Sequence, residues 1–151
     1  MTVVDSVRYA RPDEVRLLEQ LQRRASMAWA GYADRLAAID DGVRISVAAV
    51  RDQRVRVATG GGTTLGFSTV VPADDDRCRL EALFVDPEWS GRGVGSRLLR
   101  DAEEVAADEG RAHLEVITDR STVGFFEGAG YTGSDPVEAW CGTMVRLSRT
   151  L

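Results

Sequence analysis

The sequence contains no lysine, a single histidine and only two cysteines among its 151 residues. A P-loop, which binds nucleotide phosphates, requires a lysine after its last glycine, so this chain has no P-loop. Cys78 and Cys141 lie far apart, each in an expected strand and without a second ligand nearby. We therefore expect both thiols to be reduced and buried, rather than joined in a disulfide or bound to a metal.

The lone histidine, His113, alternates with the apolar residues Leu114 and Val116 in an expected strand. Residues two apart in a strand share a face, so His113 and Glu115 are expected on the outer face of the sheet. This position favours a surface role for His113 over a catalytic one.

Long apolar runs are missing too, and residues 1–10 lack the basic-then-apolar pattern of a signal peptide. We expect a cytoplasmic protein with no membrane partner. The 19 basic residues are outnumbered by 24 acidic ones, and the resulting net charge of −5 argues against nucleic acid as a partner. Hydrophobic residues make up 44% and charged residues 28%, as in ordinary globular proteins, so residues 1–151 are expected to form a single domain.

The spacing of the apolar residues predicts both strands and helices. Strands are expected at residues 3–10, 55–59, 64–71, 78–85, 112–118 and 140–147. Helices are expected from residue 11 to about residue 25 and at residues 34–39, 93–108 and 121–129, with a further helical turn in residues 45–52. Because strands outnumber helices and the first strands read as hairpin-connected, we predict an α/β fold with a mixed sheet and helices on both faces.

Residues 79–108 form the segment around which the chain is organised. An apolar strand is followed by the turn Asp86-Pro87, a loop with Gly91, Gly93 and Gly95, and a long amphipathic helix. Glycines let the backbone approach a ligand closely, and the first N–H groups of a helix have no intrahelical partner. The segment therefore predicts an anion site, most simply for phosphate. The spacing does not fit a dinucleotide-binding fingerprint, whose third glycine would fall on Ser96 or Leu98.

Two motifs in this order resemble those of the GNAT superfamily of N-acyltransferases. Residues 90–95 (Ser-Gly-Arg-Gly-Val-Gly) are similar to its acyl-CoA signature, Gln/Arg-x-x-Gly-x-Gly/Ala, and follow Leu83-Phe84-Val85-Asp86-Pro87. Residues 119–131 are similar to the family pattern Asn-x-x-Ala-x-x-Phe-Tyr-x-x-x-Gly-Phe. The resemblance implies an acyl-CoA-dependent N-acetyltransferase. It also implies a central, mostly antiparallel sheet of about six or seven strands with a splayed parallel pair.

The resemblance further implies a set of residues that bind acetyl-CoA, the co-substrate, with no metal. In such proteins the loop amides hold the pyrophosphate of CoA, and Arg92 would add a charge-assisted hydrogen bond. Pantetheine would lie along the edge of the preceding strand, and a backbone N–H near Phe84 and Val85 would stabilise the oxyanion. The implied CoA-binding residues are Phe84, Val85, Ser90, Gly91, Arg92, Gly93, Val94, Gly95, Ser96, Asp119 and Phe126.

Acetyl transfer to an amine requires a base, because an alkylamine has a pKa of about 10.4 and is protonated at neutral pH. Glu81 is the candidate for this general base. It lies in the middle of an apolar strand and matches a position where a number of family members carry a glutamate. The alternative is a surface glutamate paired with Arg79 or another arginine.

Three positions depart from the family pattern. Phe126 stands where a tyrosine usually protonates the leaving thiolate, Asp119 replaces an asparagine, and Ser90 replaces glutamine or arginine. A thiol has a pKa of about 8.5 and leaves as the thiolate, so the missing acid is expected to slow the reaction rather than abolish it. Tyr131 or Tyr32 would substitute only if the fold brings its hydroxyl near the sulfur, and Tyr131 is expected to fill the aromatic slot after Gly130.

The acceptor amine is not identified by the sequence. Its groove is expected to be built from residues 27–41, 72–76 and 135–140, with Trp29, Tyr32 and Trp140 as candidate substrate contacts. Aromatic residues at helical spacing also pack in cores, which is the alternative for Trp29 and Tyr32. Three functions stay open: direct transfer from acetyl-CoA to an amine, a non-catalytic acyl-CoA-binding or regulatory module, and a protein N-terminal or lysine acetyltransferase. A homodimer also stays open.

Overall fold

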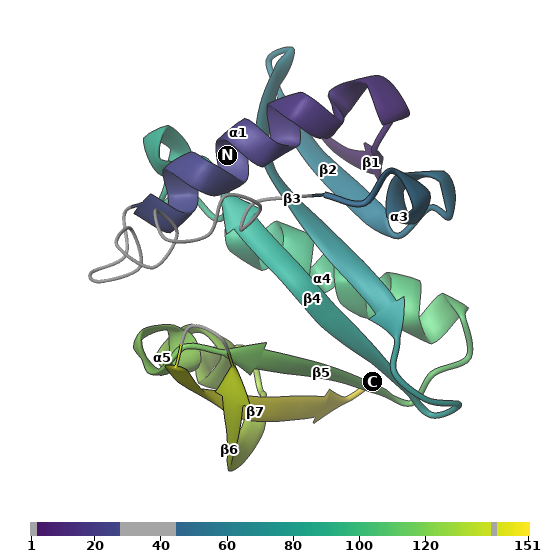
Figure 1. The fold of residues 1–151 in the computed structure, drawn as a ribbon, viewed down its shortest axis with the longest axis vertical. Coiled ribbons are helices and arrows are strands. Elements are labelled where there is room, and N and C mark those ends of the chain that lie inside the picture. Colours follow the sequence, from purple (N-terminus) through teal and green to yellow (C-terminus); the bar gives the residue numbers. More distant parts are fainter. Residues whose placement is uncertain (1–2, 28–44, 140–141) are drawn as a thin grey trace. The chain divides into compact units, whose positions relative to one another are not determined.

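A computed structural model of the chain describes residues 3–27, 45–139 and 142–151. Its strands form a seven-stranded sheet in the order β1-β2-β3-β4-β5-β7-β6 (Figure 1). The strands are β1 (Ser6–Tyr9), β2 (Val55–Gly60), β3 (Thr63–Pro72), β4 (Arg77–Val85), β5 (His113–Thr118), β6 (Thr132–Ala139) and β7 (Gly142–Thr150). The helices are η1 (Pro12–Glu14), α1 (Val15–Met27), α3 (Val47–Arg51), η2 (Pro87–Trp89), α4 (Val94–Asp108), η3 (Arg120–Thr122) and α5 (Val123–Gly128).

The pairing of the strands confirms the predicted mixed sheet. β4 and β5 are parallel, whereas β1 with β2, β2 with β3, β5 with β7 and β6 with β7 are antiparallel. Pairing between β4 and β5 ends at Leu80 and Val116, although β4 runs on to Val85 and β5 to Thr118. The parallel pair therefore separates after four residue pairs, as predicted for a splayed pair.

The chain divides into two compact units, which are described separately. Unit 1 comprises Met1–Thr69 and Ala82–Leu99, and unit 2 comprises Val70–Glu81 and Arg100–Leu151. The division runs through β4, between Glu81 and Ala82, and through α4, between Leu99 and Arg100. Among the described residues, no helix combines the length and the apolar character needed to cross a bilayer.

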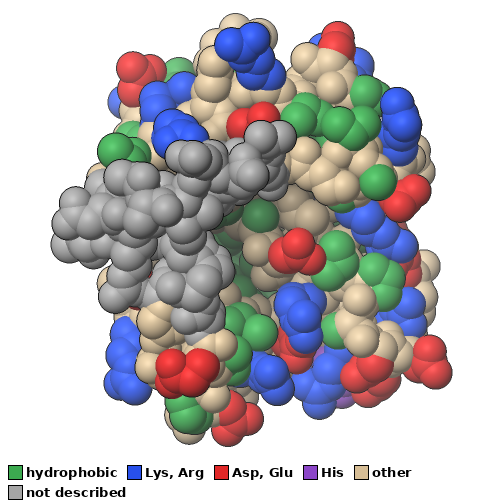
Figure 2. Space-filling view, viewed as in Figure 1, with side chains coloured by type: hydrophobic (Ala, Val, Ile, Leu, Met, Phe, Trp, Pro, Cys, Tyr) green, Lys and Arg blue, Asp and Glu red, His purple; other side chains and the backbone are tan. Residues whose placement is uncertain are grey.

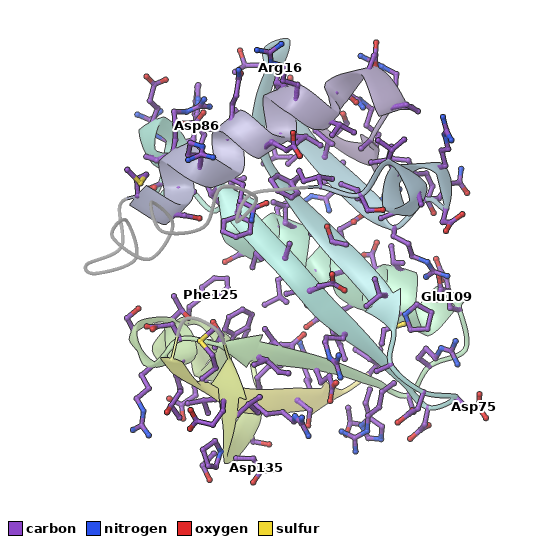
Figure 3. The ribbon with its side chains drawn as sticks, in the orientation of Figure 1. Arg16, Asp75, Asp86, Glu109, Phe125 and Asp135 are labelled. Carbon is purple, nitrogen blue, oxygen red and sulfur yellow. The ribbon has the colours of Figure 1, made fainter. Side chains whose placement is uncertain are left out.

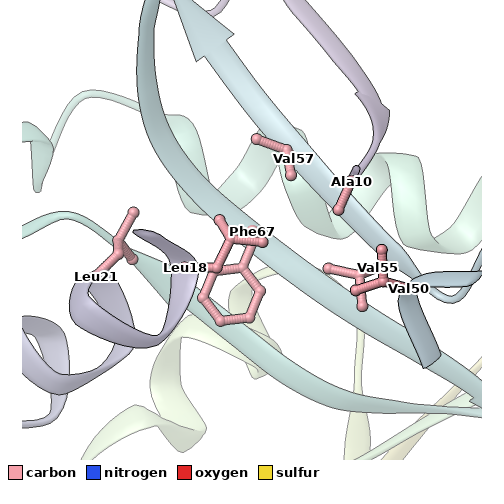
Figure 4. Packing of buried hydrophobic residues seen from close by; sticks show 7 residues of the cluster. All are labelled: Ala10, Leu18, Leu21, Val50, Val55, Val57 and Phe67. Carbon is pink, nitrogen blue, oxygen red and sulfur yellow. The ribbon is translucent and has the colours of Figure 1, made fainter. Parts of the chain in front are cut away.

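The core of unit 1 has two layers because successive residues of β2 point to opposite faces. One cluster joins Leu18 and Leu21 of α1 to Val57 of β2 and Phe67 of β3 (Figure 4). A second cluster joins Ala58 of β2 to residues of β3 and α4, namely Leu65, Val94 and Leu98. Helices thus cover both faces of the β2–β3 part of the sheet, which confirms that prediction.

The sheet of unit 2 is apolar on one face. Leu80 of β4, Leu114 and Val116 of β5, and Leu147 of β7 are all buried. Cys78, on the same face as Leu80, is a free and buried cysteine, as predicted; burial raises the pKa of its thiol. Cys141 lies outside the described residues.

The predicted final strand at residues 140–147 is wrong in its limits, and β6 was not predicted. β7 runs from Gly142 to Thr150, and β6 occupies residues that read as a turn. Thr132, Gly133, Ser134, Asp135 and Pro136 carry strong turn signals. Pairing with β7 overrides them, with a register irregularity between Thr132 and Asp135. The helix predicted at residues 34–39 lies outside the described residues.

A part-buried ion pair between Arg8 and Glu14 lies just before the start of α1. The carboxylate of Glu14 accepts hydrogen bonds from Arg8 Nη1 and Nη2, both at 2.8 Å, and from the backbone N–H of Arg11 at 2.8 Å. The hydrogen bonds from Arg8, reinforced by Arg11, lower the pKa of Glu14 from 4.5 to about 2. The pair therefore stabilises the fold fully above pH 4.5, and this contribution is lost as the pH falls towards 2.

Glu14→Gln is expected to lower the free energy of unfolding by about 1–2 kcal/mol at neutral pH, because it removes charge-assisted hydrogen bonds. Urea unfolding at a series of pH values should show this deficit shrinking below pH 4.5. Asp13→Asn is the matched control, since the Asp13 side chain is 77% exposed. A Glu14→Gln deficit that stays constant down to pH 2 would contradict the assignment.

Candidate functional site

The glycine loop after β4 has the backbone geometry of an anion site. Gly91 and Gly93 have φ angles of +72° and +84°, in the left-handed region that favours glycine. α4 begins at Val94, and the N–H of Arg97 donates to the carbonyl of Gly93 at 3.0 Å. The N–H groups of Val94, Gly95 and Ser96 therefore lie in the first turn, where a helix offers no acceptor. All residues from Ser90 to Ser96 belong to unit 1.

Asp86 fixes the start of this loop (Figure 3). Its N–H donates to the carbonyl of Leu65 at 2.8 Å, and its carboxylate accepts from the N–H of Glu88 at 3.1 Å. The same carboxylate accepts from Arg24 Nη2, in the last turn of α1, at 2.7 Å. The sequence signals the Asp-Pro cap at the start of η2, but not Arg24, which is 62 residues away along the chain.

Arg92 of the loop packs on Trp89 of η2. The guanidinium carbon of Arg92 lies 5.2 Å from the centroid of the Trp89 ring, and Trp89 packs against the second apolar cluster of unit 1. Arg92 is exposed, as is Ser90, which ends η2. The guanidinium of Arg92 is therefore placed over Trp89, next to the start of α4 in the sequence, and its role in binding CoA stays a prediction.

The end of β4 comes unusually close to β3. A Cβ on Gly66 would lie 2.6 Å from the carbonyl oxygen of Phe84 and 3.2 Å from the Cα of Val85. The Phe84 ring packs on Phe67 with centroids 5.7 Å apart. Packing thus holds the backbone at Phe84 and Val85. The predicted oxyanion donor is an N–H of this segment. This role stays a prediction.

Glu81 is exposed and forms no hydrogen bond or ion pair with the described part of the chain. The alternative in which Arg79 pairs with it is not found. Arg79 instead donates from Nε to Oε1 of Glu115 at 2.8 Å, and its Nη2 forms an ion pair with the same oxygen at 2.7 Å. The carboxylate of Glu81 is therefore not engaged by its neighbour Arg79, and its role as a base stays a prediction.

Asp119 and Phe126, both in unit 2, have structural roles. Asp119 Oδ1 accepts from the N–H of Ser121 at 2.7 Å and caps η3. Phe126 is buried and packs edge-on against Phe125 and Tyr131, with ring centroids 5.0 and 5.7 Å apart. Aspartate and asparagine cap helix N-termini about equally well, and this is a physical reason why Asp119 can stand in place of the asparagine of the family pattern.

The hydroxyl of Tyr131 is engaged inside unit 2. Tyr131 fills the slot after Gly130, as predicted, and only 1% of it is exposed. Its hydroxyl donates to Glu103 Oε2 at 2.7 Å, and Arg149 Nη1 lies 3.1 Å from the same oxygen. Burial, followed by the bond to Glu103, raises the pKa of Tyr131 above that of a free phenol. The proton of the Tyr131 hydroxyl is therefore used in the hydrogen bond to Glu103.

The predicted acceptor contacts Trp29, Tyr32 and Trp140 lie outside the described residues. Among residues 3–27, 45–139 and 142–151, no three His, Cys, Asp or Glu side chains are grouped as a metal ion would require. The site residues that the structure describes thus fall into two groups. Unit 1 holds the loop and the end of β4, and unit 2 holds Glu81, Asp119 and Phe126.

Comparisons with known proteins agree with this geometry. A family model described as the acetyltransferase (GNAT) domain matches residues 51–133, more than half of the chain. A Methanocaldococcus jannaschii protein described as an uncharacterized N-acetyltransferase is 28% identical over 71 residues, which cover 45% of this chain. The match spans 31% of that relative's own length.

Solved structures share the fold over essentially the whole chain. A GCN5-related N-acetyltransferase from Rhodopseudomonas palustris has a TM-score of 0.81 at 20% identity, covering 100% of this chain and 98% of its own. The PaiA N-acetyltransferase from Thermoplasma acidophilum, solved in complex with coenzyme A, has a TM-score of 0.74 at 14% identity, covering 97% and 98%. Family model, motifs and fold lead to one conclusion: the chain belongs to the GNAT acetyltransferase family.

Proposed function

We propose that the chain is an acyl-CoA-dependent N-acetyltransferase that moves an acetyl group from acetyl-CoA directly to an amine. The observation that carries this proposal is the loop of unit 1, where two glycines at positive φ lead into the first turn of α4. That loop lies inside the segment matched by the family model. A neighbour of the same fold, the Thermoplasma acidophilum enzyme, was solved with coenzyme A.

In this proposal the loop and the end of β4 bind different parts of acetyl-CoA. The N–H groups from Gly91 to Ser96 bind the pyrophosphate, helped by the positive end of the α4 dipole. Arg92 adds a guanidinium, which suits phosphate oxygens. Beyond Leu80 no pairing of β4 with β5 is found in the described residues, and the backbone on that side of β4 is proposed to bind pantetheine. Because Gly66 has no side chain, the backbone of Phe84 and Val85 lies close to β3. An N–H of this segment donates to the oxyanion in this proposal.

Glu81 is proposed as the general base, directly or through a water molecule. Glu81, directly or through water, takes one proton from the ammonium, and the neutral amine attacks the thioester carbonyl. The oxyanion collapses, the C–S bond breaks, and the nitrogen loses its second proton to solvent, which gives the amide and a thiolate. Phe126 carries no proton to donate, and the Tyr131 hydroxyl is held by Glu103. The thiolate therefore leaves without an acid from either residue and takes its proton from solvent, which a thiol's pKa of about 8.5 permits.

A thiol-release assay with acetyl-CoA and a panel of amines tests this function. Glu81→Gln is expected to lower kcat at least about tenfold, a lower bound on the roughly 10²- to 10⁴-fold contribution of a positioned base, without weakening CoA binding measured by calorimetry. Glu104→Gln is the matched control, because Glu104 is an exposed glutamate on α4. Unchanged turnover in Glu81→Gln would remove Glu81 from the mechanism.

The burial of Phe126 and the engaged hydroxyl of Tyr131 also favour a second candidate, a non-catalytic acyl-CoA-binding module. CoA would then raise the melting temperature, but no amine, peptide N-terminus or lysine peptide would be acetylated. Peptide acceptors in the same assay separate a protein acetyltransferase from a small-molecule enzyme. Failure of CoA to raise the melting temperature would contradict all these versions.

A further inference from the structure

Unit 2 has a polar sheet face opposite its apolar one. Arg79 of β4 pairs with Glu115 of β5, and Glu115 pairs with Ser148 of β7. Residues two apart on one strand share a face, so Arg77 and Glu81 lie beside Arg79. Figure 2 shows basic and acidic side chains interspersed over the region where β4, β5 and β7 lie. Charged groups of both signs are therefore gathered next to the proposed base.

Glu115 is buried although it lies on this polar face. Only 5% of its side chain is exposed, whereas 39% of Arg79 and 40% of Arg77 are. Arg79 donates one hydrogen bond, from Nε to Oε1, and its Nη2 lies 2.7 Å from the same oxygen, whereas Arg77 Nη1 lies 4.0 Å from Oε2, beyond hydrogen-bond distance. A buried carboxylate is costly unless it is paired, so its presence here fixes the Arg79 guanidinium in one orientation.

The arginines keep donors that Glu115 does not use. A guanidinium has five N–H donors, and Arg79 donates one of them, Nε–H, to Glu115. The other charged groups at this end of the face are His113 and Asp76, which pair with each other at 3.3 Å. Two half-exposed guanidinium groups therefore face the single carboxylate of Glu115, and Arg77 keeps donors that Glu115 does not accept.

We propose that Arg77 and Arg79, oriented by Glu115, bind an anionic group of the acceptor, so that the acceptor is an amine that also carries a carboxylate or a phosphate. This inference rests on the proposed function, with Glu81 receiving the amine. A strand rises about 3.3 Å per residue, so Arg79 and Arg77 lie about 7 and 13 Å from Glu81 along β4. The acceptor therefore holds its amine and its anion about 7 Å or more apart. A second cation in place of the anion is disfavoured.

The first test measures anion binding without turnover. Sodium acetate and inorganic phosphate are titrated at constant ionic strength, and the side-chain Nε–H signals of the arginines are followed by NMR. Saturable shifts are expected for Arg77 and Arg79, and none for Arg16, an exposed arginine of α1 (Figure 3). A stronger response to acetate than to phosphate assigns a carboxylate acceptor, and the reverse assigns a phosphate. Absence of any shift at Arg77 and Arg79 overturns the proposal.

The second test compares acceptors of equal length: 5-aminovalerate, 5-aminopentanol and cadaverine, with 4-aminobutyl phosphate against 4-aminobutanol as the phosphate arm. The anionic amines are expected to have kcat/KM at least about tenfold above their neutral partners, the factor that 1.4 kcal/mol supplies. Arg77→Gln, whose guanidinium makes no hydrogen bond to Glu115, is expected to raise KM for the anionic amines and leave kcat within about twofold. Arg79→Gln is expected to do the same more strongly, and Arg16→Gln is the control for net charge.

Equal use of neutral, cationic and anionic amines overturns the proposal, as does a preference that survives in both arginine variants. Glu115 is a positioning residue, so Glu115→Gln is expected to weaken the preference for anionic amines while acetylation of neutral amines persists. If Glu115→Gln does not fold, Arg77→Gln decides. Turnover of no amine at all contradicts the proposed function, and the NMR titration then still decides whether the anion site exists.

Discussion

Gly93→Val is expected to weaken CoA binding about a hundredfold, or about 2.7 kcal/mol. Gly93 has a φ of +84°, where a residue with a side chain pays about 1–3 kcal/mol and a β-branched one pays most. A Cβ at this position would meet no protein atom within 4 Å, so the effect comes from the backbone rather than from a clash. The loop is expected to leave the conformation that presents its N–H groups, which calorimetry with CoA would measure.

Gly93→Asn separates backbone conformation from side-chain bulk. Asparagine tolerates the left-handed region far better than valine, so this variant is expected to lose no more than about tenfold in affinity. Equal losses in both variants would mean that the added atoms obstruct the ligand. Wild-type affinity in Gly93→Val would mean that the loop does not hold CoA, and the proposed site would be lost with it.

Gly66→Ala is expected to lower the free energy of unfolding by about 3 kcal/mol, at the upper end of overpacking effects. The added Cβ would lie 2.6 Å from the carbonyl oxygen of Phe84 and 3.2 Å from Leu98 Cδ1. The first of these atoms belongs to the backbone of β4 and has no rotamer to move away. Urea unfolding measures the loss, and the CoA affinity of the folded fraction reports whether Phe84 and Val85 have shifted.

Gly124→Ala is the control for Gly66→Ala. Gly124 lies in α5, and a Cβ there would meet nothing within 4 Å. Alanine is a better helix former than glycine, so this variant is expected to be up to about 1 kcal/mol more stable than the wild type. A Gly66→Ala variant as stable as Gly124→Ala would show that β3 and β4 adapt to the extra atom without cost.

Features determined by residues that are close together along the chain were predictable from the sequence. The loop from Ser90 to Ser96 and the start of α4 follow from glycine spacing and helix periodicity, and the structure has them where predicted. The mixed sheet followed from the pattern of strands and helices, and its parallel pair followed from the resemblance that these motifs carry. The slot for Tyr131 was predicted in the same way, because Gly130 and the short helix before it are local signals.

Features that depend on distant pairing were not predictable. β6 is rich in turn residues and is a strand only because β7 pairs with it. The contact of Arg24 with Asp86 joins residues 62 apart, and that of Arg79 with Glu115 joins residues 36 apart. Glu115 was expected on the outer face with His113. It shares that face, but the arginines bury it, because a charge at a strand centre attracts long basic side chains from the neighbouring strand.

The place of β7 in the sheet has a consequence for biosynthesis. β7 is the last of the seven strands along the chain, yet it lies between β5 and β6. Until residues 142–150 have left the ribosome, β5 and β6 each present an edge with unpaired backbone groups, and such edges invite association with other chains. β7 pairs with β5 and β6, both in unit 2, and the described strands of unit 1 pair without it, so unit 1 is free to form first during synthesis. The interval before β7 emerges is then the period in which the nascent chain most needs protection by a chaperone.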